Sequence, residues 1–307
     1  MRTIYIILFS IIIFSCSKKI EKTPVVISLL GKSYFEPERS EKSQGALDSN
    51  LNVAKSNFEK DASENNYIWY GRRLGYFSRF QEAIDVFTEG ISKYPASAKL
   101  YRHRGHRYIS LRQFSKATED LKKADELSSE SPIEIEPDGS PNKLNIPLST
   151  TQFNSRYHLG LAFYLQEDFK NAEQSYQSCL LTCNNDDLMI ATIDWLYMTY
   201  KREGKEQEAS KLLDNVLDSM NIVENDSYYK RCMMYKGKIS PDSLLKVSSD
   251  ENDPDLALAT QGYGVGNWYL YNGDSAKAKE IFEKVVAGKH FSAFGFIASE
   301  AELARWK

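Results

Sequence analysis

The chain repeats one pattern of small and large residues at a distance of 34 positions. When residues 65–95 are aligned with residues 98–127, four pairs match at this distance: Gly71 with Gly105, Phe80 with Phe114, Ala83 with Ala117, and Phe87 with Leu121. Apolar residues within each copy recur every three or four positions, which is the period of an amphipathic helix. A repeat of this length predicts a helical hairpin that cannot bury its apolar face alone. The chain is therefore limited to a stack of such hairpins.

These positions resemble the tetratricopeptide repeat. Its conserved pattern of large, glycine, large, alanine, aromatic and proline positions is matched in the first copy by Tyr67, Gly71, Leu74, Ala83, Phe87 and Pro95. The second copy has Tyr101, Gly105, Tyr108, Ala117 and Leu121 and lacks the proline. In this family the small residues let the two helices of a hairpin approach closely, and the aromatic residues fill the space between hairpins.

Further copies extend the resemblance along the chain. Their matching residues are Gly160, Phe163, Phe169, Ala172 and Tyr176, then Leu196, Tyr200, Gly204, Ala209 and Leu213, and finally Gly266, Tyr269, Ala278 and Phe282. A degenerate copy is expected at 227–247, a lone second helix at 51–61 and a closing helix at 291–307. The resemblance thus implies an all-α superhelix of about six hairpins over residues 51–307.

The N-terminus has the features of a targeting segment. Arg2 precedes an apolar run from Ile4 to Phe14, which is shorter than the roughly 20 residues that span a bilayer. The run ends in Ile-Phe-Ser-Cys at 13–16, which resembles the lipobox of bacterial lipoproteins. That resemblance implies a signal peptide at 1–15 and lipidation of Cys16, where two acyl chains would anchor the protein stably. A plain secretory signal with a chance cysteine is the alternative.

The segment after Cys16 is polar and irregular. We expect residues 16–50 to form a lipidated flexible tether, although the stretch at 25–30 could dock on the repeats. Ser17, in place of an aspartate, suggests an outer-membrane lipoprotein of the bacterial cell envelope, on the periplasmic face. The remaining cysteines, Cys179, Cys183 and Cys232, are interpreted as small buried helix residues.

Resemblance to the repeat family also predicts the residues of a concave groove, on one face of the first helix of each hairpin. The corresponding residues here are Arg72, Tyr76, Arg102, His106, Tyr157, Tyr164, Asp194, Lys201, Arg202, Tyr263, Asn267 and Tyr271. This groove would be basic at its N-terminal end and rich in tyrosine beyond. Arginine binds carboxylate or phosphate bidentately, and tyrosine offers flat amphipathic area. The predicted ligand is an acidic peptide or an acidic glycan.

An insertion at 128–152 separates the second and third copies and carries the acidic residues Glu130, Glu134, Glu136 and Asp138 among four prolines. Three interpretations remain open for the basic residues. The insertion could fold back and neutralise Arg72 and Arg102, these arginines could bind an external anion, or the face could simply be solvated.

Other functions have little support in the sequence. A net charge of −3 excludes a generally basic nucleic-acid-binding protein. His103 and His106 lack a carboxylate on the same helix that would complete a metal site, so we expect no metal and no cofactor. Gly262 and Gly264 are attributed to close approach of a neighbour. We therefore predict a non-enzymatic scaffold that binds an envelope protein or peptide. The alternatives are a binder of an acidic glycan or small anion in the same groove and, remotely, a hydrolase that uses Glu136 and Asp138.

Overall fold

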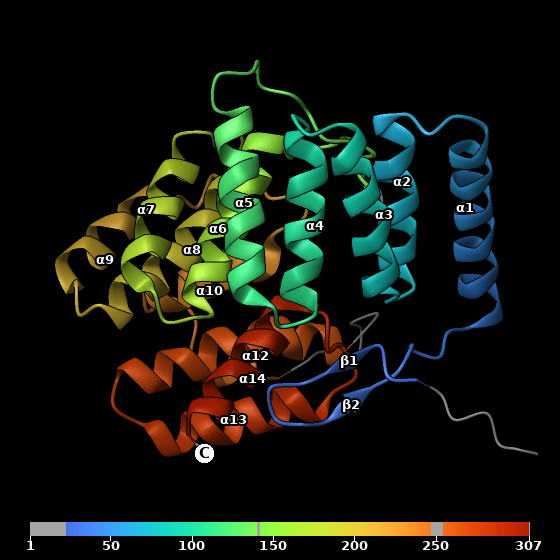
Figure 1. Ribbon diagram of the computed structural model, residues 1–307. Helices are drawn as coiled ribbons and strands as arrows, with labels where there is room; N and C mark the ends of the chain where they lie inside the picture. The colour runs from blue at the N-terminus through green and yellow to red at the C-terminus, as the bar shows by residue number, and fades with distance from the viewer. Residues whose placement is uncertain (1–22, 140–141, 247–253, 307) are drawn as a thin grey trace, which may run out of the picture.

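A computed structural model describes residues 23–139, 142–246 and 254–306 (Figure 1). The predicted signal peptide at 1–15 and Cys16 lie outside these ranges. The elements are β1 (Val26–Ile27), β2 (Ser33–Tyr34), α1 (Glu41–Lys60), α2 (Glu64–Tyr76), α3 (Phe80–Lys93), α4 (Ala98–Ser110), α5 (Phe114–Ser128), α6 (Thr151–Tyr164), α7 (Phe169–Leu180), α8 (Asp186–Arg202), α9 (Glu206–Leu212), the 3₁₀ helix η1 (Leu213–Asn215), α10 (Asp226–Tyr235), α11 (Pro241–Leu244), α12 (Pro254–Tyr271), α13 (Ser275–Ala287) and α14 (Phe294–Arg305).

The helices from α2 to α13 form six antiparallel pairs, and α14 closes the stack as predicted. The pairs are α2 with α3, α4 with α5, α6 with α7, α8 with α9, α10 with α11, and α12 with α13. The degenerate pair is the shortest, because α11 contains only four residues. The all-α repeat architecture is thus confirmed. Among the described residues, the isolated bridge between Ile135 and Thr150 is the one strand-like pairing besides β1 and β2.

Close packing inside each pair depends on the small residues of the repeat. A Cβ atom added to Gly71 would lie 2.4 Å from the ring of Phe87, and one added to Gly105 would lie 2.7 Å from Leu121. Ala83 and Ala117 are fully buried on the facing helices. The 34-residue pattern therefore encodes the contact between the two helices of a hairpin.

Each pair turns through one residue in the left-handed region of backbone space. These residues are Ser78, Arg112, Glu167, Gly204, Gly237 and Gly273, with φ between 60° and 92°. Glycine adopts this region at little cost, whereas a residue with a Cβ is strained there. Three of the six turns thus have a residue with a side chain at a strained backbone position. One of these residues, Arg112, also forms a buried ion pair with Glu300.

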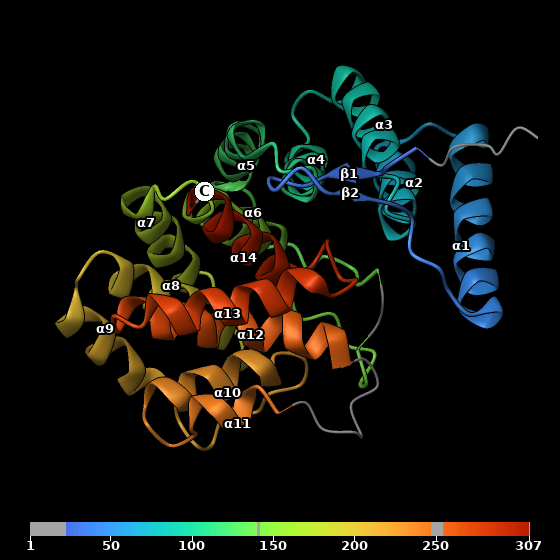
Figure 2. The same cartoon turned by 90° about the horizontal axis from the view of Figure 1, so that it is seen from below.

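The last repeats fold back against the concave side of the earlier ones. Figures 1 and 2 show α12, α13 and α14 crossing below the ends of α6 and α8, whereas β1 and β2 cross below α4. Helix α12 contacts α8, α10, α13 and α14. Its sequence is apolar around much of the circumference, which is typical of a helix enclosed by others.

Residues 23–50 contain two paired strands and the start of α1, which corrects the prediction of a flexible tether for this part of 16–50; residues 16–22 lie outside the described ranges. Strands β1 and β2 pair antiparallel, with Val26 opposite Tyr34. The Tyr34 ring stacks on Phe291 with 5.0 Å between centroids. Burial of Val26 and Tyr34 confirms that the stretch at 25–30 docks on the body. The sequence reasoning missed this order because two-residue strands carry almost no periodic signal.

A buried ion pair fixes this N-terminal hairpin to the C-terminal helix. Glu300, on α14, accepts hydrogen bonds from the backbone N–H of Leu29 at 2.6 Å and from Arg112 Nη2 at 2.8 Å. Arg112 also donates to the carbonyl of Phe291 at 2.7 Å. One carboxylate therefore joins the N-terminal hairpin, the α4–α5 turn and the last helix.

The predicted lone helix at 51–61 is longer than expected. Helix α1 begins at Glu41, where the Ser40 side chain accepts a hydrogen bond from the backbone N–H of Ser43. Phe58 packs edge-to-face on Tyr67 of α2, with 4.8 Å between ring centroids. In the ranges that the structure describes, no helix has both the length and the apolar character needed to cross a bilayer.

Candidate binding pocket in the N-terminal half of the groove

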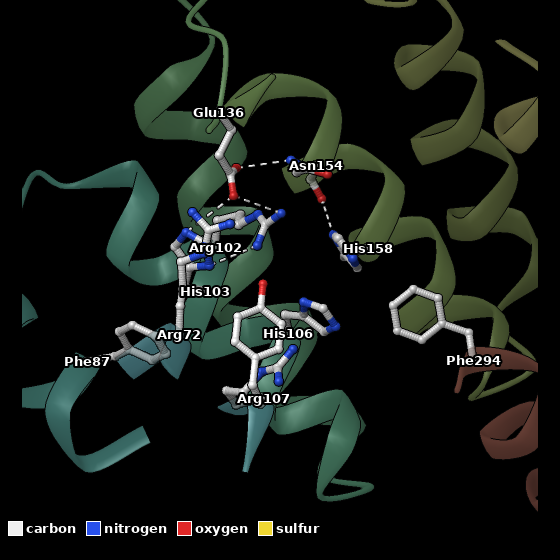
Figure 3. A pocket seen from close by; sticks show the side chains of 11 residues that line it. Arg72, Phe87, Arg102, His103, His106, Arg107, Glu136, Asn154, His158 and Phe294 are labelled. Atoms are coloured by element: carbon white, nitrogen blue, oxygen red, sulfur yellow. Dashed lines mark hydrogen bonds and ion pairs between the residues drawn. The ribbon is translucent and has the colours of Figure 1, made fainter. Parts of the chain in front are cut away.

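The first helices of the first two pairs present their basic residues to one pocket of about 290 Å³ (Figure 3). Helix α2 contributes Arg72 and Tyr76, and α4 contributes a run of basic side chains. The lining residues are Arg72, Tyr76, Phe87, Arg102, His103, His106, Arg107, Glu136, Asn154, His158 and Phe294. In a superhelix, equivalent positions on the first helices of neighbouring pairs lie side by side. The structure thus brings together Arg72, Tyr76, Arg102 and His106 as predicted.

Residues 134–139 of the insertion, which we call the strap, cross this pocket. Glu136 is buried, and one of its carboxylate oxygens lies 3.1 Å from Arg102 Nη2 and 3.3 Å from His103 Nε2. The other oxygen accepts a hydrogen bond from Asn154 Nδ2 at 3.0 Å. Glu134 pairs with Lys99 at the edge of the repeats. The insertion therefore does neutralise Arg102 internally, through the carboxylate of Glu136.

Backbone carbonyl groups hold the next part of the strap. Arg72 donates to the carbonyl of Pro137 at 2.9 Å, and Arg73 donates to that of Gly139 at 3.0 Å. Gly139 lies so close to Tyr76 that an added Cβ atom would be 1.6 Å from the phenolic oxygen. Arg72 is thus bound through a neutral acceptor rather than through the carboxylate that internal neutralisation predicts. Asp138, the third predicted residue of the insertion, has a buried Oδ2 without a hydrogen-bond partner in the described chain.

Three histidines lie among these arginines and are held neutral. The Nδ1 atom of His103 accepts from Arg102 Nη1 at 2.8 Å, so its proton lies on Nε2, toward Glu136. Burial, reinforced by neighbouring arginines, lowers the pKa of His103 and of His106 well below the ordinary value. The same causes lower the pKa of His158 to about 3. The rings of His106 and His158 stack with 4.4 Å between centroids.

Positive charge exceeds negative charge in the pocket. Arg72, Arg102 and Arg107 all line it, whereas Glu136 is the one carboxylate in ion-pair contact with any of them in the described ranges. Burial lowers the pKa of Arg107 to about 10, and its guanidinium makes no hydrogen bond or ion pair with the described residues. The buried Nε of Arg102 also has no acceptor there. Unpaired donors and excess charge of one sign are the conditions under which an anion binds.

The C-terminal half of the predicted groove is a packing interface, which corrects the prediction of a tyrosine-rich binding surface. Tyr157, Tyr164, Tyr263 and Asn267 are buried, and Tyr271 is largely covered. Tyr263 and Asn267 on α12 each donate to the hydroxyl of Tyr164 on α6, both at 2.9 Å. The reason is that α12 and α14 occupy the concave face. These tyrosine rings are therefore not exposed for stacking on a sugar, which was the basis of the acidic-glycan alternative.

The basic residues in this half are also paired. Arg202 lies 2.6 Å from Glu302 of α14 and 3.1 Å from Glu167. Lys201 pairs with Glu206 and lies over the ring of Tyr271. These two predicted groove residues join α8 to its neighbours. They also line a separate hollow of about 450 Å³, together with Tyr271.

A buried ion pair that the sequence did not reveal lies deeper in this interface. Arg231 on α10 and Asp194 on α8 are both fully buried, and Arg231 Nε donates to Asp194 Oδ1 at 2.9 Å. Gly264 makes room for Arg231, since an added Cβ atom would lie 2.2 Å from Arg231 Cδ. Gly262 faces Val285 in the same way, at 2.5 Å. Close approach of a neighbour thus explains both glycines.

The sequence reasoning also missed several pocket residues. Arg107, Asn154, His158 and Phe294 line the pocket but are not among the predicted groove residues. The periodicity of α4 places Arg107 one turn from His103, a signal that could have included it. The approach of Phe294 on α14 had no such signal, because it depends on the return of the last helices. No group of three or more His, Cys, Asp or Glu residues suited to a metal occurs in the described ranges.

Comparison with solved structures identifies the class of fold. The stack of helical pairs is an α-solenoid, and a tetratricopeptide repeat protein from Parabacteroides merdae matches it with a TM-score of 0.50 and 15% identity, over 86% of this chain and 94% of that one. YrrB, a tetratricopeptide repeat protein with an unusual peptide-binding site, matches with a TM-score of 0.43 and 16% identity, over 77% and 92%. No protein-family model and no curated protein matches the chain. The chain therefore has the tetratricopeptide-repeat fold that its sequence predicts.

Proposed function

We propose that this protein is a tetratricopeptide-repeat scaffold that binds an acidic segment of a partner protein in the N-terminal half of its groove. The observation that carries the proposal is the charge of the pocket, where Arg72, Arg102 and Arg107 surround a single ion-paired carboxylate, that of Glu136. A half-buried cation without an acidic partner costs folding free energy. Residues that lower stability in this way are typical of binding sites.

A partner carboxylate would satisfy these groups. Guanidinium groups bind carboxylates with paired hydrogen bonds. The Arg107 guanidinium lines the pocket, lies over the ring of Phe80 and donates no hydrogen bond to the described residues. The neutral histidines and Phe294 add flat, partly apolar walls against which the ligand's stem could pack. The pocket thus suits an acidic side chain of a peptide.

The test is in-cell cross-linking and affinity purification of the full-length protein from detergent-solubilised membranes. Wild type is compared with Arg72→Ala/Arg107→Ala and with the control Lys123→Ala/Lys284→Ala, which removes the same charge from exposed helix faces. We expect a stoichiometric partner that is lost in the arginine variant and kept in the control. Arg107→Ala alone should melt no lower than wild type, because it removes an uncompensated charge, whereas Arg72→Ala also removes the hydrogen bond to the carbonyl of Pro137. A partner retained by both variants would contradict the proposed site.

We further propose that Cys16 is lipidated and holds the scaffold at the outer membrane of a bacterial envelope, facing the periplasm. The lipobox-like sequence at 13–16 supports this proposal. Metabolic labelling with an alkyne fatty acid should label wild type and Cys183→Ser but not Cys16→Ser. Labelling of Cys16→Ser, or none in wild type, would contradict it. Density-gradient separation of the two membranes tests the location.

A further inference from the structure

We propose that the strap is a built-in competitor for the partner's acidic segment, and that it occupies the site until the partner displaces it. This inference rests on the proposed function of the pocket. It also specifies the partner segment, as an extended chain that presents a glutamate side chain followed by accessible backbone carbonyl groups.

The first step of the argument is that the strap is bound as a ligand would be. The Glu136 carboxylate contacts Arg102 at 3.1 Å and Asn154 at 3.0 Å. The two carbonyls that follow, of Pro137 and Gly139, accept from Arg72 and Arg73. Arginines therefore bind one side-chain carboxylate and two backbone carbonyl groups of the strap. A groove recognises an extended peptide through contacts of these kinds.

The second step is that few forces other than charge and hydrogen bonding hold the strap. The side chains of Ile133 and Ile135, which precede and alternate with the two glutamates, are 62% and 58% exposed. Pro137 is exposed as well. Because almost no apolar surface is buried, the strap has little hydrophobic stabilisation and its polar contacts can be exchanged for equivalent ones.

The third step is that backbone hydrogen bonds hold the base of the strap, whereas arginine side chains hold residues 137–139, and the next described anchor is the hydrogen bond from Asn142 to Glu224. The backbone N–H of Glu136 donates to the carbonyl of Ser149 at 2.9 Å, and that of Thr151 donates to the carbonyl of Glu134 at 3.1 Å. Beyond Glu136 the hydrogen bonds that hold the described part of the strap are the two arginine–carbonyl contacts. The strap can therefore lift at residues 137–139 while its base stays in place.

The fourth step is that lifting the strap would enlarge the site. A second hollow of about 610 Å³ shares Arg72, Tyr76, Arg102 and Glu136 with the pocket and is lined on its other side by Val223, Glu224 and Asp226. Glu136 of the strap lines both hollows, and residues 137–139 line the second one. Departure of the strap would therefore open the first hollow toward the second, and would leave Arg102 without its carboxylate partner.

A synthetic peptide with the strap's own sequence provides the probe. Fluorescently labelled Ile-Glu-Ile-Glu-Pro-Asp-Gly, with blocked ends, is titrated with the full-length protein in detergent, and binding is followed by anisotropy. Four proteins are compared: wild type, Glu136→Gln, Gly139→Val and the control Glu130→Gln, which changes an exposed acid of the same insertion. Gly139→Val leaves every pocket arginine and glutamate unchanged but cannot seat against Tyr76.

We expect both strap variants to bind the peptide at least about tenfold more tightly than wild type and the control, which corresponds to about 1.4 kcal/mol. A peptide with glutamine at the second glutamate should not bind. Equal affinity of all four proteins, or equal binding of the glutamine peptide, would overturn the inference. If partner capture still depends on Arg72 and Arg107 in that case, the proposed function stands and only the competition is refuted.

Discussion

Substituting glycine by alanine should have opposite effects at two helical positions of this chain, Gly264 in α12 and Gly45 in α1. A Cβ atom on Gly264 would lie 2.2 Å from Arg231 Cδ and 2.9 Å from Nε, whereas one on Gly45 would have no heavy atom within 4 Å. Carbon atoms in favourable contact are about 3.5–4.0 Å apart, so Arg231 would have to move by about 1 Å or more.

Arg231 cannot move that far and keep its hydrogen bonds. Its Nε–Asp194 distance of 2.9 Å and its Nη1–Thr260 distance of 2.7 Å would exceed the usual limit of about 3.2 Å. Breaking a buried ion pair costs about 3–5 kcal/mol, and replacing a helical glycine by alanine returns about 1 kcal/mol. The net destabilisation by Gly264→Ala is therefore about 2–4 kcal/mol. Gly45→Ala should raise the free energy of unfolding by about 0.5–1 kcal/mol.

The assay is denaturant unfolding of both variants and wild type, followed by far-ultraviolet circular dichroism. The shared chemistry of the two substitutions makes each the control for the other. A Gly264→Ala protein as stable as wild type would refute the packing argument, and so would a loss of stability in Gly45→Ala.

Two further predictions concern the junction of the chain ends and the pocket histidines. Glu300→Gln should lower the free energy of unfolding by about 3 kcal/mol, since it leaves the buried Arg112 without its counter-charge. It should also make residues 23–39 accessible to limited proteolysis, because Leu29 is bound to Glu300. A proteolysis pattern equal to that of wild type would contradict this role. Stability should fall as pH decreases from about 6.5 toward 4, because the pKa of His158 is about 3 in the folded protein and the unfolded chain, with its ordinary pKa of about 6.5, binds the proton first. Each such histidine makes the free energy of unfolding change by up to about 1.4 kcal/mol per pH unit in this range. The free energy of unfolding is measured by denaturation at several pH values, and in His158→Gln its pH dependence should be smaller by the contribution of one proton.

The fold could be predicted because its determinants are local. Glycine and alanine at fixed positions, such as Gly71 and Ala83, fix the contact between two helices that are neighbours in the sequence. The same reasoning placed Arg72 and Arg102 on one face, because adjacent repeats differ by one unit of the superhelix. Six pairs and a closing helix follow from counting these units.

The site could be predicted only where neighbouring repeats form it. Tyr164 and Tyr263 occupy groove positions of their own repeats, yet they meet each other in the core because the superhelix returns on itself. How far the superhelix curves back on itself depends on the sum of many small rotations between neighbouring repeats. No single residue determines this curvature. The apolar circumference of α12 was a sign that this helix is enclosed, but it does not say by which partners.

The ion pair between Arg112 and Glu300 has a consequence for how the molecule unfolds. A solenoid with free ends frays one repeat at a time, since each unit is stabilised only by its neighbours. Here the hairpin of β1 and β2 lies against the last helix, so detachment of either the hairpin or α14 breaks the junction that secures the other. We therefore expect the two ends to unfold cooperatively. A cut or truncation at one end should first destabilise the structure at the opposite end of the sequence.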